Sequence, residues 1–169
     1  KLFKTFAEVP DFTWVVFDDL LTFQPSNRQR ALLYGQLATL YEQAKRPDLS
    51  CKARLKLADY LAKEKQYKKA IESLAMAIKM FPDEGRYVPK MLDRLEQVCK
   101  ESKLPKTEQQ LVQFYAECLP MIPPKRGDAS SEFCMQMYER GIALFQTFGQ
   151  AQLVAQYTMQ LKKLQASKI

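Results

Sequence analysis

Apolar side chains recur three or four residues apart along almost the whole chain, and prolines or short polar turns interrupt them at regular intervals. Side chains with this spacing line one face of an α-helix. A half-buried strand would instead need apolar and polar residues to alternate, and no segment sustains such an alternation. The pattern therefore predicts an all-α fold.

The interruptions divide the chain into about eight helices. They are expected over residues 12–23, 28–45, 49–64, 67–81, 84–103, 107–119, 130–148 and 150–166. Ser26 or Asn27 can cap the second of these helices. Pro89 lies where the first turns of the fifth would be, so this helix is expected to start near Val88. Short turns join the helices in sequence, which predicts a solenoid of about four antiparallel helix pairs.

One segment, residues 51–82, has a more specific pattern. Its large, small and helix-breaking residues are Leu57-Ala58, Leu61, Tyr67, Ala70, Leu74, Ala77 and Pro82. Small residues are needed where two helices cross, large ones fill the space between successive pairs, and proline stops the second helix. This segment resembles the tetratricopeptide repeat (TPR), a helix–turn–helix unit of about 34 residues.

The resemblance is weaker elsewhere in the chain. Residues 92–123 repeat the spacing, with Cys99 and Cys118 at two of the small-residue positions. Near the start, Asp18 replaces the usual small residue, and the last pair keeps Gly141 and few other motif positions, as a capping pair does. Cysteine at a packing position behaves as a small hydrophobic residue.

The resemblance implies one TPR-like domain over residues 1–169, wound as a right-handed solenoid. Its expected parts are an N-terminal extension at 1–11 and helix pairs at 12–47, 48–83, 84–124 and 129–166. Because the chain begins with Lys1 rather than methionine, we expect it to be a fragment of a longer protein.

Catalytic patterns are missing from the sequence. The chain contains no histidine, so the commonest general base and the commonest zinc ligand are absent. No nucleophile elbow, phosphate-binding loop or dinucleotide-binding glycine motif occurs, and the five glycines are scattered singly. We therefore expect a protein that is not an enzyme, with no catalytic residues, cofactor or metal site.

The four cysteines, Cys51, Cys99, Cys118 and Cys134, lie far apart in the sequence and form no C-x-x-C motif. They are expected to be free and mostly buried thiols in a reducing compartment, and we therefore expect a cytoplasmic protein. The longest apolar run, residues 14–17, is too short for a transmembrane segment.

TPR domains bind an extended peptide or a partner helix in a groove lined by the first helix of each pair. By resemblance, the positions expected to be exposed in this groove are Lys52, Leu55, Lys56, Asp59, Ala62 and Lys63 in one first helix, and Asp93, Glu96 and Lys100 in the next. We therefore expect a protein–protein interaction scaffold, whose mixed charges favour an acidic or mixed-charge peptide.

Two other functions remain open at this point. Residues 52–106 hold 14 basic and 8 acidic residues, which is +6 of the net charge of +7, so an RNA-binding helical-repeat module is the first alternative. A structural or oligomerisation domain, which would self-associate, is the second.

Overall fold

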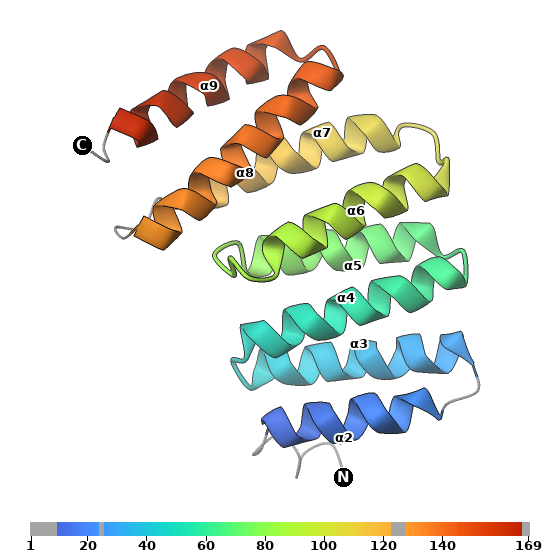
Figure 1. Ribbon diagram of the computed structural model, residues 1–169. Helices are drawn as coiled ribbons and strands as arrows, with labels where there is room; N and C mark the ends of the chain where they lie inside the picture. The colour runs from blue at the N-terminus through green and yellow to red at the C-terminus, as the bar shows by residue number, and fades with distance from the viewer. Residues whose placement is uncertain (1–9, 24–25, 123–127, 167–169) are drawn as a thin grey trace. The chain divides into compact units, whose positions relative to one another are not determined.

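In the computed structural model, residues 10–23, 26–122 and 128–166 are described, and their arrangement confirms the all-α prediction (Figure 1). The elements are α2 (Pro10–Thr22), α3 (Asn27–Gln43), α4 (Pro47–Lys63), α5 (Tyr67–Met80), α6 (Val88–Ser102), α7 (Thr107–Cys118), the short 3₁₀ helix η1 (Leu119–Met121), α8 (Asp128–Thr147) and α9 (Ala151–Ala166). No strand occurs in these ranges.

Most helix ends lie where the sequence predicts them. The side chain of Ser26 caps α3 by accepting a 3.1 Å hydrogen bond from the Gln29 N–H, and α6 starts at Val88 as expected. At two prolines, the structure corrects the expected helix boundaries. Pro47, expected to end the preceding helix pair, is the first residue of α4, and Pro10, assigned to the extension at 1–11, begins α2. Proline suits the first helical position because the N–H it lacks would have no partner there.

The chain forms two compact units. The N-terminal unit, Lys1–Ser102, contains α2 to α6, and the C-terminal unit, Lys103–Ile169, contains α7, η1, α8 and α9. The helix pair expected over 84–124 therefore has α6 in one unit and α7 in the other, and its pairing stays a prediction. Most of the expected extension, residues 1–9, lies outside the described residues.

Helix α4 lies at the centre of the N-terminal unit, where it contacts α3, α5 and α6. Three alanines that the repeat pattern places at helix crossings, Ala58, Ala70 and Ala77, are completely buried. Their small side chains allow the helix backbones to approach closely, while larger residues such as Leu37 and Leu74 fill the remaining space. The burial expected for these packing positions is confirmed.

The C-terminal unit is held together by contacts of α8 with α7, η1 and α9. Tyr157 of α9 is almost completely buried, and its hydroxyl donates a 3.0 Å hydrogen bond to the carbonyl oxygen of Ala116 in α7. A Cβ atom at Gly141 of α8 would overlap the end of the Leu119 side chain, which would have to shift to make room for it.

One turn geometry joins three pairs of helices. The third residue after each of α3, α4 and α8 donates its backbone N–H to the carbonyl oxygen five residues earlier. These donors are Arg46, Gln66 and Gln150. The residue before each donor has a left-handed backbone, with φ of 55° at Lys45, 57° at Lys65 and 67° at Gly149. This is the hydrogen bonding of a Schellman cap, in which glycine is the usual left-handed residue.

Replacing Lys65 with glycine is therefore expected to stabilise the N-terminal unit by about 0.5–1 kcal/mol, because glycine adopts this backbone without a steric penalty. Urea unfolding followed by the fluorescence of Trp14, the chain's only tryptophan, measures the effect. Lys65→Ala is the matched control, since it removes the same charge and keeps the Cβ atom. If both variants have equal stability, backbone strain at residue 65 is not the cause.

Candidate functional site

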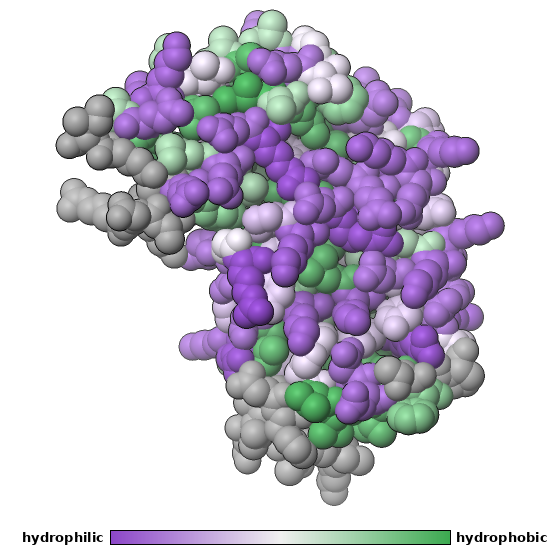
Figure 2. All heavy atoms as spheres, in the orientation of Figure 1, coloured by the Kyte–Doolittle hydropathy of each residue, from purple (hydrophilic) through white to green (hydrophobic). Residues whose placement is uncertain are grey.

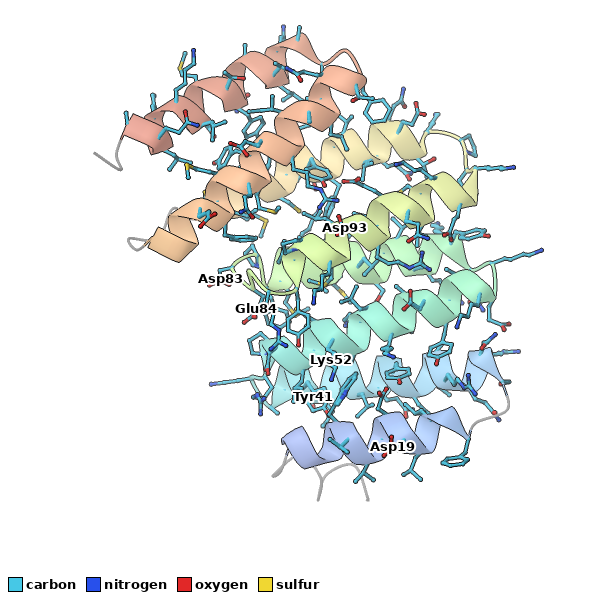
Figure 3. The ribbon with its side chains drawn as sticks, in the orientation of Figure 1. Asp19, Tyr41, Lys52, Asp83, Glu84 and Asp93 are labelled. Atoms are coloured by element: carbon cyan, nitrogen blue, oxygen red, sulfur yellow. The ribbon has the colours of Figure 1, made fainter. Side chains whose placement is uncertain are left out.

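The predicted groove residues lie on two neighbouring helices of the N-terminal unit. In α4 they form one stripe, because Lys52, Lys56, Asp59 and Lys63 recur every three or four residues, and Leu55 lies on the same side. In α6, Asp93, Glu96 and Lys100 form a second stripe in the same way. We call these eight residues the α4–α6 face. Figure 3 shows Lys52 and Asp93 on their two helices.

An ion pair joins the two helices beside this face. The Arg94 Nε atom of α6 lies 2.7 Å from an oxygen of Asp59 in α4, and Arg94 also approaches Glu101 at 3.3 Å. The Arg94 side chain is mostly buried, whereas nearly half of the Asp59 side chain is exposed. The Arg94 guanidinium group therefore fixes the position of the Asp59 carboxylate, and the exposed part of this carboxylate stays open to a partner.

Aromatic rings support two of the lysines. The Lys52 ammonium lies 4.0 Å from the centre of the Trp14 ring of α2, and the Lys63 ammonium lies 4.9 Å from the centre of the Tyr60 ring. Burial lowers the pKa of Lys52 from its ordinary value, although Asp18 acts in the opposite direction. These cation–π contacts hold the two charges at defined positions along the stripe.

Asp18, which departs from the TPR pattern, has a polar partner. It accepts a hydrogen bond from the hydroxyl of the buried Tyr34, and burial together with this bond raises the pKa of Tyr34 far above its ordinary value. The Tyr34 ring also stacks on Tyr60, with 5.6 Å between the ring centres. A carboxylate is thus tolerated at this packing position because a phenol satisfies it.

One expected exposed position is wrong. Ala62 is buried, with 6% of its surface exposed, because α4 is covered by three neighbouring helices and presents only a narrow stripe. Of the eight residues of the α4–α6 face, Lys63, Asp93 and Lys100 are exposed and the others are half-buried. Figure 2 shows that the surface over α4 and α6 is largely hydrophilic.

A second surface of the N-terminal unit was not predicted. A cavity of about 1200 Å³ lies between α3 and α5, with α4 as its floor. We call it the α3–α5 groove. Its apolar lining includes Leu32, Gly35, Leu57, Leu61 and Met76, and none of the residues of the α4–α6 face contributes to it. The adjacent leucines at 32 and 33 are the signal that could have found it, because one of two neighbouring residues must point away from the helix's packing stripe.

Arg54 is a charged residue in the floor of this groove. It is 7% exposed, and its Nε and Nη2 atoms lie 3.1 and 2.7 Å from one oxygen of Glu42. Ser50 donates to the same oxygen, and the Arg54 Nη1 atom lies 3.4 Å from the Ser73 hydroxyl. This network ties α3, α4 and α5 together.

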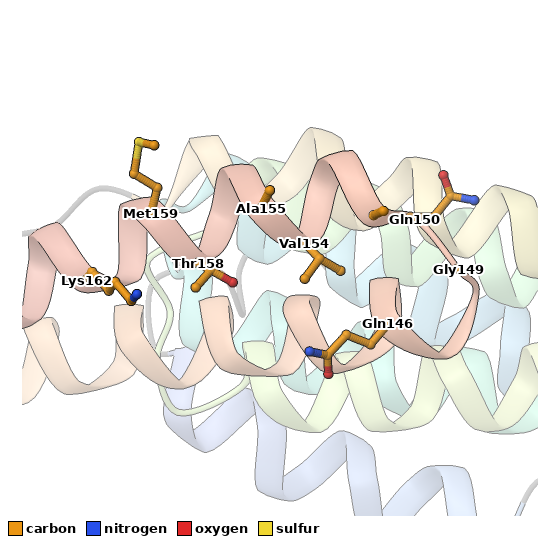
Figure 4. Close-up of a pocket in the computed structure, with 9 residues that line it drawn as sticks. Gln146, Gly149, Gln150, Val154, Ala155, Thr158, Met159 and Lys162 are labelled. Atoms are coloured by element: carbon orange, nitrogen blue, oxygen red, sulfur yellow. The ribbon is translucent and has the colours of Figure 1, made fainter.

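The C-terminal unit has a smaller open cavity of about 770 Å³ (Figure 4). It is lined by α8, α9 and the turn at Gly149, and includes the apolar side chains of Val154 and Met159. The lining shows no concentration of charged groups, with Lys162 as its charged residue.

All four cysteines are buried and free, as predicted. Burial raises the pKa of Cys51 to about 12 and that of Cys99 to about 11, which keeps both thiols protonated and weakly nucleophilic at neutral pH. In the described ranges, no group of three or more acidic or cysteine side chains could hold a metal ion. Among the described helices, none combines the length and apolar character that a bilayer-spanning segment needs.

Comparison with known proteins gives no further assignment: no protein-family model, curated protein or solved structure matches this chain.

Proposed function

We propose that this chain is a non-enzymatic protein–protein interaction scaffold, built as a right-handed solenoid of TPR-like helix pairs. The α4–α6 face binds a peptide or a helix of the partner. The observation that carries the proposal is the direct contact between α4 and α6, the first helices of two expected pairs, which brings both predicted stripes side by side. The Arg94–Asp59 ion pair fixes their spacing.

The charges of this face suit a partner that is acidic or carries both signs. The α4 stripe is mostly basic, with Lys52, Lys56 and Lys63 around Asp59, and the α6 stripe carries Asp93, Glu96 and Lys100. Charges at a rim determine orientation and selectivity more than total affinity. A peptide that places carboxylates against Lys56 and Lys100 fits this arrangement.

The basic residues of the segment 52–106 favour RNA binding less than they favour a protein partner. Two of its arginines, Arg54 and Arg94, are engaged by carboxylates within the N-terminal unit. These two cations are therefore less available for contacts with phosphate groups.

Reversing the charge of Lys56 and Lys100 is expected to weaken partner binding about tenfold or more without unfolding the protein. The test begins with affinity capture from a native lysate, with and without nuclease and at two salt concentrations, followed by mass spectrometry. The captured protein's binding segment is then titrated against the wild-type chain and the variant Lys56→Glu/Lys100→Glu.

The matched control is Lys68→Glu/Lys79→Glu, which makes the same charge change on α5 and should leave the affinity within a factor of about two. Capture that disappears with nuclease would support the RNA-binding alternative instead. Capture of further copies of this chain alone would support an oligomerisation domain.

A further inference from the structure

The α3–α5 groove lies on the side of α4 opposite to the α4–α6 face. Successive residues of a helix are about 100° apart, which places Arg54 and Leu61 roughly half a turn away from Lys52 and Lys56, with Leu57 between the two sides. A partner in the groove would therefore leave the α4–α6 face accessible.

The dimensions of the groove suit a helix better than a small molecule. Its volume of about 1200 Å³ exceeds the range of ~300–1000 Å³ that is usual for small-molecule pockets. Its lining along α3 extends from Arg28 to Gln43, which corresponds to about 22 Å or four helical turns. Leu32 and Met76, on its two walls, are 63% and 44% exposed. An amphipathic helix would cover both side chains.

The exposed basic side chains of the groove, Arg28 and Lys69, lie at one end. Both α3 and α5 run antiparallel to α4, so their N-termini lie at the same end of the groove (Figure 1). Arg28 and Lys69 line this end, and the partial positive charges of the two helix dipoles add to theirs. Neither α3 nor α5, both fully described, has an acidic residue in its first turn. The acidic residue of the lining, Glu72, lies further along and pairs with Lys68 at 4.0 Å.

We propose that the α3–α5 groove binds an amphipathic helix of a partner protein, with acidic residues in the last turn of that helix. The apolar face of this helix packs on Leu32, Leu57 and Met76. Its negative C-terminal end lies against Arg28 and Lys69, so the partner helix runs antiparallel to α3 and α5. The inference rests on the proposed scaffold function and adds a second docking surface with its own partner chemistry.

A display library of helical peptides of about 15 residues, selected against the full chain, tests this proposal. Selected peptides should carry an apolar stripe at i, i+3, i+4 and i+7, with Asp or Glu in the last turn. Their affinity should fall about tenfold or more in Leu32→Glu/Met76→Glu and in Arg28→Glu/Lys69→Glu. The control Arg86→Glu/Lys90→Glu changes the same charges on an exposed segment elsewhere in the N-terminal unit and should bind normally.

The orientation of the helix can be measured separately. Because all four native cysteines are buried, a cysteine introduced at Gln66 or at Gln43 accepts a fluorophore selectively. A quencher on the acidic C-terminal end of a selected peptide should quench the label at position 66 more strongly than the label at position 43. Equal quenching, or the reverse order, would overturn the antiparallel arrangement.

Several results would overturn the proposal, and they separate it from the scaffold function. The selected peptides could instead bind more weakly to Lys56→Glu/Lys100→Glu and normally to the groove variants. That result would support the scaffold function and show that the groove is not the binding site of the peptides. Failure to select any helical peptide at micromolar affinity would overturn the groove proposal, whereas the capture experiment would still test the scaffold function. A wild-type dimer that Leu32→Glu/Met76→Glu converts to a monomer would assign the groove to a second copy of the chain instead.

Discussion

Replacing Arg54 with methionine should lower the free energy of unfolding of the N-terminal unit by about 3 kcal/mol, because it leaves a mostly buried carboxylate without its cation. The side chains of Arg54 and Glu42 are 9% and 18% exposed, so water can replace little of the lost interaction. Ser50 would remain as a donor to Glu42 but carries no charge. Urea unfolding followed by Trp14 fluorescence reports on this unit, since Trp14 packs on Tyr34 and Tyr41.

Arg46→Met is the matched control. Arg46 also binds a carboxylate, that of Asp48, at 2.9 Å, but both side chains are about a third exposed and the expected loss is below about 1 kcal/mol. The double variant Arg54→Met/Glu42→Met should recover part of the loss, because it removes both buried charges together. Equal destabilisation by Arg54→Met and Arg46→Met would show that burial does not determine the strength of this pair.

Raising the pH from 9 to 11 should destabilise the N-terminal unit by roughly 4–5 kcal/mol through two buried thiols. The pKa of Cys51 rises from 9.0 to about 12 and that of Cys99 from 9.0 to about 11, in both cases chiefly because burial disfavours the thiolate. Between the unfolded and folded pKa values, the folded chain keeps these protons and the unfolded chain has lost them. The stability is therefore fully present below pH 9 and is lost as the pH rises, by about 1.4 kcal/mol per pH unit for each thiol.

Urea unfolding at pH 7, 9, 10 and 11 measures this dependence. The variant Cys51→Ala/Cys99→Ala should be less stable at neutral pH because of the cavities it creates, but its stability should fall less steeply above pH 9. Tyr34, whose pKa is also raised, contributes only at the alkaline end of the range. If the wild-type chain and the double variant lose stability in parallel, the thiols do not cause the alkaline loss.

Part of the α4–α6 face could be predicted from the sequence. The residue spacing correctly grouped Lys56, Asp59 and Lys63 on one side of a helix, because the side chains of a helix repeat every 3.6 residues. The spacing could not show that Ala62 is buried, since that depends on which neighbours cover α4. The Asp59–Arg94 ion pair joins residues that are distant in sequence, and no local pattern predicts such a pairing.

The α3–α5 groove was not predicted, because its shape depends on how α3, α4 and α5 pack. Leucine and methionine are usually core residues, and Leu32 and Met76 are exposed only because α3 and α5 are separated at this point. Arg54 appears in the sequence as one more cation of a basic stretch, whereas in the structure it is buried against Glu42. Its charge therefore contributes to cohesion of the unit rather than to its surface.

The sequence by itself determined where helices form and end, because helical hydrogen bonds are local and signals such as Ser26 and Pro89 act on the turn they occupy. The repeat spacing also identified small residues that are buried, such as Ala58 and Ala77. Only the tertiary structure decided which helix faces are covered, which charges are paired and where a groove stays open. These properties depend on contacts between residues far apart in the chain, whose energies arise only once the helices have packed.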